Sequence, residues 1–407
     1  MPRRLRILFV IGSMSGGGAE RQMIEILKHL DRERFEPILY VGSRRGELLG
    51  EIPADVPGHS FWEDFLRTWQ SKVHRLLRTV PLVRWRHLAK LLATERIDVV
   101  YDRTYMATLD AAAACWFRPT PRVSCCVANP DFELNAYARR MPLLARRFSR
   151  WAYSSASVVL ANSEGLRRRL IELFSLSEAR VLTRHNLIDF ERIEGLAIEF
   201  VPDVPRDPFL IVSGGRLHSQ KGQQFLFEAV RILIRERGRA LRLVSLGQGE
   251  QEQELREFIA LHKLEAHVTL PGFVSNPLPW YRHARLFVLP SLNEGFPNSL
   301  LEAVACGTPV LATDCPSGPS EILDGGRCGR LVAPGDSTAL ADAIADCMDH
   351  PAEWQSLTGA ALHRVRELCD LKTGLRRLED LLDNVATGDR PPTRSVSEGE
   401  GEGEGEA

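Results

Sequence analysis

The feature that most constrains the fold is a strand–loop–helix pattern that occurs twice in the chain. An apolar run at Ile7–Ile11 leads into a loop with four glycines and then into Arg21–Leu30, where apolar residues recur at helical spacing. The same order returns at Phe209–Val212, followed by a Gly-Gly-Arg loop and a helix predicted over Gln223–Arg235. Short apolar strands alternate with helices elsewhere, which is typical of parallel sheets covered on both faces. The sequence therefore predicts an α/β protein with two Rossmann-like domains.

A change of composition separates the two repeats. The segment Glu194–Asp207 is rich in proline and poor in periodic apolar residues, as expected of an interdomain linker. We therefore expect a first domain over residues 1–200 and a second over 201–365. A C-terminal helix is expected over 366–387, and the Gly/Glu-rich tail at 388–407 is expected to be disordered because it cannot bury a core.

Composition limits the class of protein. The 407 residues carry a formal net charge of −1, so no global field favours nucleic acid as a partner. The eight cysteines have neither C-x-x-C spacing nor a metal-ligand pattern with histidine, which favours reduced thiols in a cytoplasmic protein. The first apolar run is only as long as a strand and lacks a signal peptide's apolar core. No stretch is apolar enough to span a membrane.

The most informative stretch is Pro290–Val310. It follows an apolar strand at Leu286–Leu289 and contains a Gly/Pro/Asn-rich turn and a predicted helix, Ser299–Cys306. A strand, a loop and a helix N-terminus in this order form an anion site, because free amides and the helix dipole favour negative charge. Glu294 and Glu302 frame the site, and carboxylates accept hydrogen bonds from hydroxyls. The stretch thus predicts a ligand that carries both phosphate and sugar hydroxyls.

Ordinary structural roles compete with this interpretation. Ser299-x-x-Glu302 has the pattern of a capping box, which alone would explain Glu302. Glu294 could be a solvated loop residue.

Two cations support the ligand-binding interpretation. Arg216 and Lys221 lie on a glycine-rich loop after a predicted strand and suit a pyrophosphate, although either could be a plain surface residue. Gly247–Gly249 is a third loop at a strand's carboxyl end. The chain has no D-x-D motif, so no metal is expected, and protein cations would have to neutralise the leaving group.

Two segments of the first repeat are basic and lack acidic residues. Arg67–Lys90 interleaves cations with Trp and Leu, and its first helix is expected to end at Pro81. Arg139–Arg150 holds five arginines. A basic amphipathic helix fits a membrane surface, but an ordinary surface helix packed by its apolar face fits equally well.

Taken together, these motifs resemble the retaining glycosyltransferases of family 4, which have the GT-B fold. The similar features are E-x7-E at Glu294 and Glu302, G-G-R-L…K-G after the second repeat's first strand, P-G-F, G-T-P-V and an N-terminal S-G-G-G-A-E-R, in order over residues 5–385. The resemblance implies two Rossmann-like domains facing across a cleft, the first binding the acceptor and the second the nucleotide-sugar donor. It also implies that the final helix, within Glu353–Val385, crosses back to the first domain.

The resemblance assigns roles by position. Arg216 and Lys221 would hold the diphosphate of a UDP- or GDP-sugar, Glu302 the ribose, and Glu294 the sugar near the reacting carbon. These three residues, Glu294, Arg216 and Lys221, are the expected catalytic set, with no metal. The remaining donor-binding residues would be Gly16, Gly17, Gly215, Gly247, Phe273, Val274, Gly295, Phe296, Pro297, Asn298, Ser299 and Leu300.

The acceptor side departs from the family pattern. Many relatives carry a histidine after the fourth strand of the first domain, but Ser124–Asp131 contains none. Asn129 takes that place by alignment, and Asp131 is a candidate acceptor-side base.

We therefore predict a transferase that moves a sugar from a nucleotide-diphosphate sugar to a lipid-linked or polysaccharide acceptor in surface glycan synthesis, at the inner face of the cytoplasmic membrane. One alternative is a nucleotide-sugar isomerase or hydrolase on the same fold. A second is an NAD-dependent oxidoreductase, which the missing G-x-G-x-x-G fingerprint disfavours. A third is a non-catalytic sugar-nucleotide-binding protein, which the two carboxylates and two cations disfavour.

Overall fold

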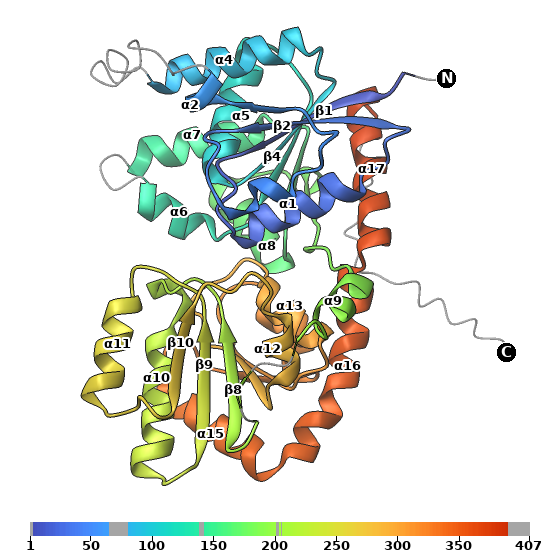
Figure 1. Cartoon of the computed structure of the whole chain (residues 1–407). Coiled ribbons are helices and arrows are strands. Elements are labelled where there is room, and N and C mark those ends of the chain that lie inside the picture. The colour runs from blue at the N-terminus through green and yellow to red at the C-terminus, as the bar shows by residue number, and fades with distance from the viewer. Residues whose placement is uncertain (1–2, 65–79, 138–141, 201–202, 205, 390–407) are drawn as a thin grey trace, which may run out of the picture. The chain divides into compact units, whose positions relative to one another are not determined.

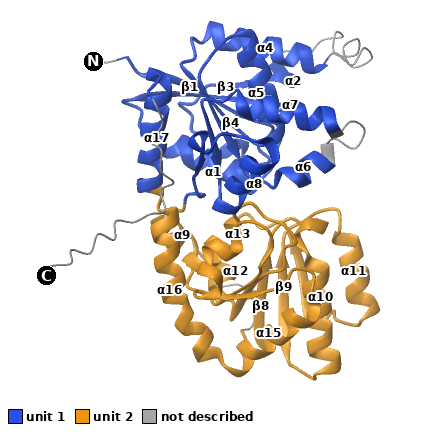
Figure 2. Cartoon of the chain, turned by 180° about the vertical axis from the view of Figure 1, so that it is seen from behind, with its two compact units in different colours: residues 1–187, 372–407 blue, residues 188–371 orange. Residues whose placement is uncertain are grey.

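The computed structural model divides the chain into two compact units, shown in different colours in Figure 2. Unit 1 consists of Met1–Leu187 with Lys372–Ala407, and unit 2 of Ile188–Leu371. The structure describes residues 3–64, 80–137, 142–200, 203–204 and 206–389. Each unit is built on a parallel sheet of its own, as the strand–loop–helix repeat predicts (Figure 1).

Unit 1 contains a seven-stranded sheet in the order β3-β2-β1-β4-β5-β6-β7. Its strands are β1 (Leu5–Ile11), β2 (Phe35–Val41), β3 (Gly58–Ser60), β4 (Val99–Arg103), β5 (Arg122–Cys126), β6 (Val158–Ala161) and β7 (Val181–Thr183). All neighbouring pairs are parallel. The strand order reverses between β1 and β4, which is the switch point of a doubly wound sheet.

Helices cover the sheet of unit 1. They are α1 (Gly18–His29), α2 (Phe61–Asp64), α4 (Val80–Thr94), α5 (Tyr105–Phe117), α6 (Pro130–Tyr137), α7 (Pro142–Ser154), α8 (Glu164–Phe174) and α17 (Leu371–Thr387), with 3-10 turns η1 (Glu47–Glu51) and η2 (Glu178–Arg180). The helices α4 and α5 pack over β1, β2 and β4 through a cluster of buried residues that includes Leu8, Val100 and Ala111. Buried apolar runs on these strands form the core, as parallel strands covered on both faces require.

A polar network lies inside this core. Asp102 accepts hydrogen bonds from Thr108 and Ser124, both at 2.6 Å, and pairs with Arg122 at 2.8 Å. The carboxylate and the guanidinium are both almost fully buried. A buried charge is tolerated only when it is paired and hydrogen-bonded, so this network fixes β4 against β5 and α5.

Unit 2 contains a six-stranded parallel sheet in the order β10-β9-β8-β11-β12-β13. Its strands are β8 (Phe209–Gly214), β9 (Leu241–Leu246), β10 (Val268–Gly272), β11 (Leu286–Leu289), β12 (Val310–Thr313) and β13 (Arg330–Val332). The order reverses between β8 and β11. Ligands of doubly wound folds bind outside the carboxyl ends of the strands at such a reversal.

Two apolar clusters lie on the two faces of this sheet. Successive residues of β8 alternate between them, with Leu210 and Val212 in one and Ile211 in the other, because strand side chains alternate in direction. The surrounding elements are α9 (Phe190–Leu196), η3 (Ser219–Lys221), α10 (Gln223–Arg231), the π-turn η4 (Ile232–Glu236), α11 (Glu252–Leu261), α12 (Leu278–His283), α13 (Asn298–Ala305), α14 (Pro319–Ile322), η5 (Asp324–Gly326), α15 (Ser337–Asp349) and α16 (Pro351–Cys369).

The boundary between the units differs from the expected positions after residues 200 and 365. The chain passes from unit 1 to unit 2 after Leu187 and returns after Leu371. The two passages meet in a β-bridge, in which the Ile188 amide donates to the Cys369 carbonyl at 2.7 Å and the Leu371 amide donates to the Ile188 carbonyl at 3.1 Å. The expected linker at 194–207 therefore begins inside α9.

The same bridge explains why the expected helix over 353–385 is two helices. Asp370 adopts φ −54° and ψ 125°, outside the helical region, and separates α16 from α17. Helix α17 then packs on unit 1, where its Glu379 accepts a hydrogen bond from the Asp31 amide at 2.8 Å.

One local expectation is wrong. Pro81 does not end a helix but lies within α4, whose described part is Val80–Thr94. The part of the basic segment at 65–79 lies outside the described residues, as do residues 138–141. Within the described ranges, no helix is both long and apolar enough to cross a bilayer.

Candidate active site

The carboxyl ends of four neighbouring strands of unit 2 are joined by backbone hydrogen bonds. The Gly247 amide after β9 donates to the Gly272 carbonyl of β10 at 2.8 Å, and the Gly215 amide after β8 donates to the Leu246 carbonyl at 3.0 Å. A Cβ on Gly247 would lie 2.0 Å from the Gly215 carbonyl oxygen, so only glycine permits this close approach. The loop after β11 joins the set because the Leu292 amide donates to the Gln220 carbonyl at 2.8 Å.

The loop after β8 supplies the two expected cations. Lys221 closes the turn η3, and its side chain points to the β11 loop. Arg216 is exposed, and its guanidinium makes no hydrogen bond or ion pair with any residue that the structure describes. An exposed guanidinium at a switch point, with its donors not bonded to the described residues, is suited to a bidentate contact with phosphate oxygens.

Glu294 is not a solvated loop residue. It is 5 % exposed, and one carboxylate oxygen accepts hydrogen bonds from the Lys221 ammonium at 2.6 Å and from the Ser291 hydroxyl at 2.6 Å. The side-chain Nε2 of Gln220 donates to the Asn293 carbonyl at 2.9 Å, which holds the same loop beside η3. The structure therefore places a cation and a carboxylate, predicted from separate motifs, in direct contact at the β8/β11 reversal.

Helix α13 begins one residue earlier than expected and has no capping box. Pro297 is the N-cap, Asn298 is the first helical residue, and no side chain caps the end. Ser299 lies inside the first turn, so the Ser299-x-x-Glu302 pattern does not explain Glu302. The first backbone bond runs from the Leu301 amide to the Pro297 carbonyl at 3.2 Å. Amides of Asn298, Ser299 and Leu300 are thus first-turn donors of the kind that bind anions.

Two thiols lie near the carboxylates. Burial, with Glu302 as a smaller cause, raises the pKa of Cys306 to about 12. Burial, with Glu294 as a smaller cause, raises the pKa of Cys315 to about 12. Both thiols therefore stay protonated near neutral pH and are unsuited to nucleophilic chemistry.

Sequence reasoning missed two residues that shape this site. Ser291 orients Glu294 by donating a hydrogen bond to it. The only sequence signal for this role is that Ser291 lies three residues before Glu294. Gly318 precedes α14 with φ 92°, and a Cβ there would lie 2.8 Å from Pro297 Cδ and 2.9 Å from the Gly295 carbonyl. The Pro316–Glu321 segment thus lies directly against the loop that leads into α13.

The remaining donor-side residues of unit 2 lie close by. Gly295, Phe296 and Pro297 are buried in the loop before α13. Phe273 is 40 % exposed and follows β10, with Val274 partly buried beside it. An exposed aromatic side chain next to a phosphate-type site can stack on a planar base.

The predicted residues of unit 1 lie after the carboxyl ends of two strands, Gly16 and Gly17 after β1 and Asn129 and Asp131 after β5. Gly16 has φ 78° and Gly17 is the N-cap of α1, so both lie directly after β1. Asn129 accepts a hydrogen bond from the Asp131 amide at 2.9 Å. Asp131 forms a bidentate pair with Arg169, at 2.6 and 2.7 Å, so both carboxylate oxygens are already engaged.

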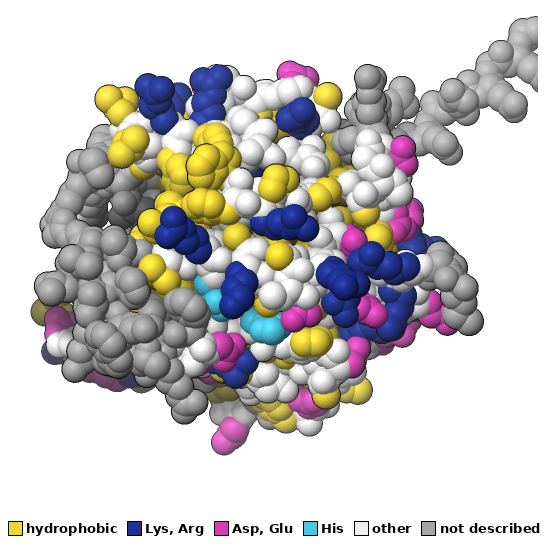
Figure 3. All heavy atoms as spheres, turned by 90° about the horizontal axis from the view of Figure 1, so that it is seen from above, with side chains coloured by type: hydrophobic (Ala, Val, Ile, Leu, Met, Phe, Trp, Pro, Cys, Tyr) yellow, Lys and Arg dark blue, Asp and Glu magenta, His cyan; other side chains and the backbone are white. Residues whose placement is uncertain are grey.

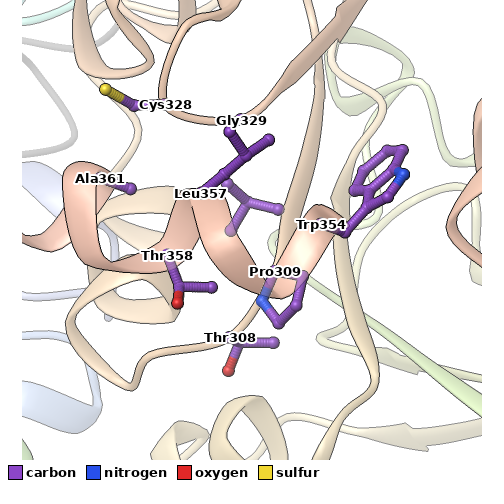
Figure 4. A pocket seen from close by; sticks show the side chains of 9 residues that line it. Thr308, Pro309, Cys328, Gly329, Trp354, Leu357, Thr358 and Ala361 are labelled. Carbon is purple, nitrogen blue, oxygen red and sulfur yellow. The ribbon is translucent and has the colours of Figure 1, made fainter. Parts of the chain in front are cut away.

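A small hollow of unit 2 lies elsewhere. It is lined by residues such as Pro309, Gly329 and Trp354, and Figure 4 shows the Trp354 and Leu357 side chains from α16 beside it. Pro309 and Gly329 precede β12 and β13, so the hollow is at the amino ends of these strands. It is therefore at the opposite edge of the sheet from the Lys221–Glu294 pair.

These two doubly wound units, one with a cation–carboxylate pair at its switch point, define a protein of the GT-B class. A family profile described as glycosyl transferases group 1 matches residues 208–350, and one described as glycosyltransferase family 4 matches residues 16–192. The two profiles match the two halves of the chain in turn and support its resemblance to the GT-B glycosyltransferases of family 4.

Similarity to known glycosyltransferases covers part of the chain. An N-acetylgalactosaminyltransferase of Campylobacter jejuni that acts on N-acetylgalactosamine-N,N'-diacetylbacillosaminyl-diphospho-undecaprenol is 30% identical over 230 residues, 56% of this chain and 61% of that protein. An uncharacterised glycosyltransferase of Methanocaldococcus jannaschii is 30% identical over 178 residues, 43% and 44% of the two chains. The chain spans about half the length of the curated relatives it matches.

Solved structures confirm the predicted fold class. Anabaena HepE in complex with UDP-glucose superposes with a TM-score of 0.73 and 21% identity, covering 94% of this chain and all of the other. Sucrose-phosphate synthase from Thermosynechococcus elongatus gives a TM-score of 0.76 at 18% identity, covering 95% of this chain.

Proposed function

We propose that the protein is a glycosyltransferase that moves a sugar, with retention of anomeric configuration, from a nucleotide-diphosphate sugar to a glycan or lipid-linked acceptor in surface glycan synthesis. The observation that carries this proposal is the Lys221–Glu294 pair beside the uncommitted Arg216, at the switch point of unit 2. Positive charge beside a carboxylate supports the binding of a ligand that carries both phosphates and sugar hydroxyls.

The reaction needs charge stabilisation at two places. As the anomeric bond breaks, positive charge develops on the sugar and negative charge on the departing diphosphate. In this proposal Arg216, Lys221 and the first-turn amides of α13 stabilise the diphosphate without a metal. Glu294 lies against the sugar near the reacting carbon, and Glu302 holds the ribose hydroxyls.

The other donor contacts follow from position. Phe273 and Val274 would contact the base, the backbone from Gly295 to Leu300 would bind sugar and phosphate, and Gly215 and Gly247 would admit the diphosphate close to the backbone. Gly16 and Gly17 would approach the donor from unit 1. Since HepE is solved with UDP-glucose, UDP-sugars are the first donors to test, followed by GDP-sugars.

The acceptor is proposed to bind unit 1 at Asn129 and Asp131, where the loop after β5 enters α6. Because Arg169 holds both oxygens of Asp131, a positioning role suits this residue better than proton transfer. The N-acetylgalactosaminyltransferase of Campylobacter jejuni acts on an undecaprenol-linked sugar, which supports a lipid-linked acceptor and contact with the cytoplasmic membrane surface.

Transfer is tested by incubating the protein with labelled nucleotide sugars and membrane lipid extract, in the presence and absence of EDTA. Label in the lipid or glycan fraction, unchanged by EDTA and lost in Arg216→Ala, supports the proposal. Complete conversion of the donor without any acceptor would instead indicate a hydrolase or an isomerase.

A further inference from the structure

His218 lies between the two cations of the loop after β8, and its side chain is bonded to that loop. The Gln220 amide donates to Nδ1 of the His218 ring at 3.1 Å, which makes His218 the N-cap of the turn η3. The Lys221 amide donates to the His218 carbonyl at 2.8 Å. The ring and the backbone of this one residue therefore both accept hydrogen bonds from the turn that ends at Lys221.

The turn η3 is also the point at which the loop after β8 contacts the loop after β11. The Gln220 carbonyl accepts a hydrogen bond from the Leu292 amide at 2.8 Å. Gly222 follows the turn with φ 63°, and a Cβ there would lie 2.1 Å from the Pro290 carbonyl oxygen. These backbone contacts determine where the Lys221 side chain begins, so the cap of the turn bears directly on the position of the Lys221 ammonium.

The cap also fixes where the ring carries its proton. A backbone amide can only donate, so Nδ1 must be unprotonated, and in the neutral ring the proton is on Nε2. Nε2 lies 3.4 Å from a carboxylate oxygen of Glu250 on the loop after β9. The two loops run side by side here, since the Leu217 amide donates to the Gln248 carbonyl and the Gln251 amide donates to the Leu217 carbonyl, both at 3.0 Å.

A second proton on the ring would break the cap. An imidazolium carries hydrogen on both nitrogens, so it cannot accept the Gln220 amide, whereas the nearby Glu250 carboxylate favours its charge. The ring is 30% exposed, so solvent protons reach it. Histidine is the side chain whose charge ordinarily changes between about pH 5 and 8, whereas the common capping residues asparagine and serine do not titrate there.

The remaining charged groups around the ring come from three neighbouring elements. Those of the loops after β8 and β11 and of the first turn of α11 are Arg216, Lys221, Glu294, Glu252 and Glu254. Lys221 is paired with Glu294, and Glu252 is paired with Arg256. Glu250 is therefore the acid whose contact with the ring bears most directly on the ring's charge.

We propose that His218 is a positioning residue of the donor site: its neutral ring caps η3 and holds Lys221 in place to bind a diphosphate, and protonation of the ring releases the turn and weakens that binding. This inference rests on the proposed function of unit 2 as a donor site. Because only the neutral ring accepts the Gln220 amide, diphosphate binding is strongest at the higher pH and falls as the pH falls.

A histidine at the surface does not by itself have such a role. Figure 3 shows histidine side chains at the surface of the molecule among basic and apolar ones. His363 provides a matched control, because it is exposed and its Nδ1 lies 3.7 Å from a carboxylate oxygen of Glu367, but it lies in the middle of α16 and not at a cap.

The test is calorimetric binding of UDP and of GDP to the wild type and to variants, at about pH 8 and about pH 5.5. His218→Asn keeps an acceptor for the Gln220 amide and should bind like the wild type at the higher pH. His218→Leu removes the acceptor and should bind on the order of fivefold more weakly at both pH values, the usual effect of losing an N-cap.

The pH dependence separates positioning from a merely structural role. At the lower pH the wild type should bind more weakly than His218→Asn, and comparison in the same buffers cancels the titration of the nucleotide itself. Glu250→Gln should keep its affinity to a lower pH than the wild type, since it removes the carboxylate that favours the charged ring. His363→Asn should follow the wild type at both pH values.

The outcomes distinguish this inference from the proposed function. If the wild type binds a nucleotide and His218→Leu binds it equally well, or if His218→Asn shares the whole loss at the lower pH, the inference is overturned and the donor site remains. Binding of neither UDP nor GDP by the wild type would contradict the donor site and this inference together. Circular dichroism verifies that each variant is folded, and a His218→Leu variant that loses stability but no affinity would also overturn the inference.

Discussion

The contact between Lys221 and Glu294 can be tested by removing each charge separately and then both together. The ammonium and the carboxylate oxygen lie 2.6 Å apart, Glu294 is 5 % exposed, and the Lys221 side chain is 27 % exposed. Breaking a fully buried pair from one side costs about 3–5 kcal/mol, because the remaining charge is uncompensated. Solvent reaches Lys221 and the Ser291 hydroxyl still donates to Glu294, so Lys221→Met should cost about 2 kcal/mol.

Glu294→Gln removes the charge but keeps the shape and a hydrogen-bond acceptor. Its cost should be about 1 kcal/mol, the usual net worth of a single hydrogen bond. The double variant leaves no unpaired buried charge. It should therefore be more stable than the sum of the single changes predicts, by about 1–2 kcal/mol.

The assay is equilibrium urea unfolding of the wild type, both single variants and the double variant, followed by circular dichroism. Costs that add within about 0.3 kcal/mol would refute the pairing. Both single variants should also lose sugar transfer while remaining folded at 25 °C. Full transfer activity in either would contradict the assignment of the site.

Three further predictions test other parts of the structure. Gly318→Ala should weaken nucleotide-sugar binding in calorimetry and destabilise the protein more than the control Gly325→Ala. Both glycines have positive φ, but only at Gly318 would a Cβ lie against the loop before α13. Equal effects of the two changes would contradict this. Asp102→Ala should destabilise unit 1 by about 3–5 kcal/mol in urea unfolding because it leaves the Arg122 guanidinium buried and unpaired; a cost below about 1 kcal/mol would be inconsistent with the network. Burial raises the pKa of Glu133 to about 8, above its unfolded value of 4.5, so the folded state retains its proton and stability should fall as pH rises from about 5 to 8. Glu133→Gln should make the free energy of unfolding, measured by urea titration at about pH 5 and about pH 8, depend less on pH than it does in the wild type. An unchanged pH dependence would contradict the raised pKa of Glu133.

Much of the fold could be predicted because its strands are short apolar runs. The predicted strand at Leu286–Leu289 coincides with β11, since a buried parallel strand is a short continuous apolar run. The three-residue strand β3 was missed because Gly58–Ser60 has no apolar pattern. Its place depends on pairing with β2 and not on its own residues.

The contacts between distant segments could not be predicted. The bridge between Ile188 and Asp370 joins parts of the chain that share no local pattern. It lies where the chain passes between the two units and where α16 is separated from α17. Likewise, the sequence identified Lys221 and Glu294 as candidates but not their direct contact. That contact requires β8 and β11 to be neighbours, which is a property of the strand order.

The central claim is that unit 2 holds a metal-independent site for a nucleotide-diphosphate sugar. Its most direct test is calorimetric binding of UDP- and GDP-sugars to the wild type and to Arg216→Ala, in EDTA and in magnesium. The account predicts that one nucleotide sugar binds with the same affinity in both buffers and that Arg216→Ala abolishes or strongly weakens this binding. Binding that requires magnesium, is unchanged in Arg216→Ala, or occurs only with NAD would contradict it.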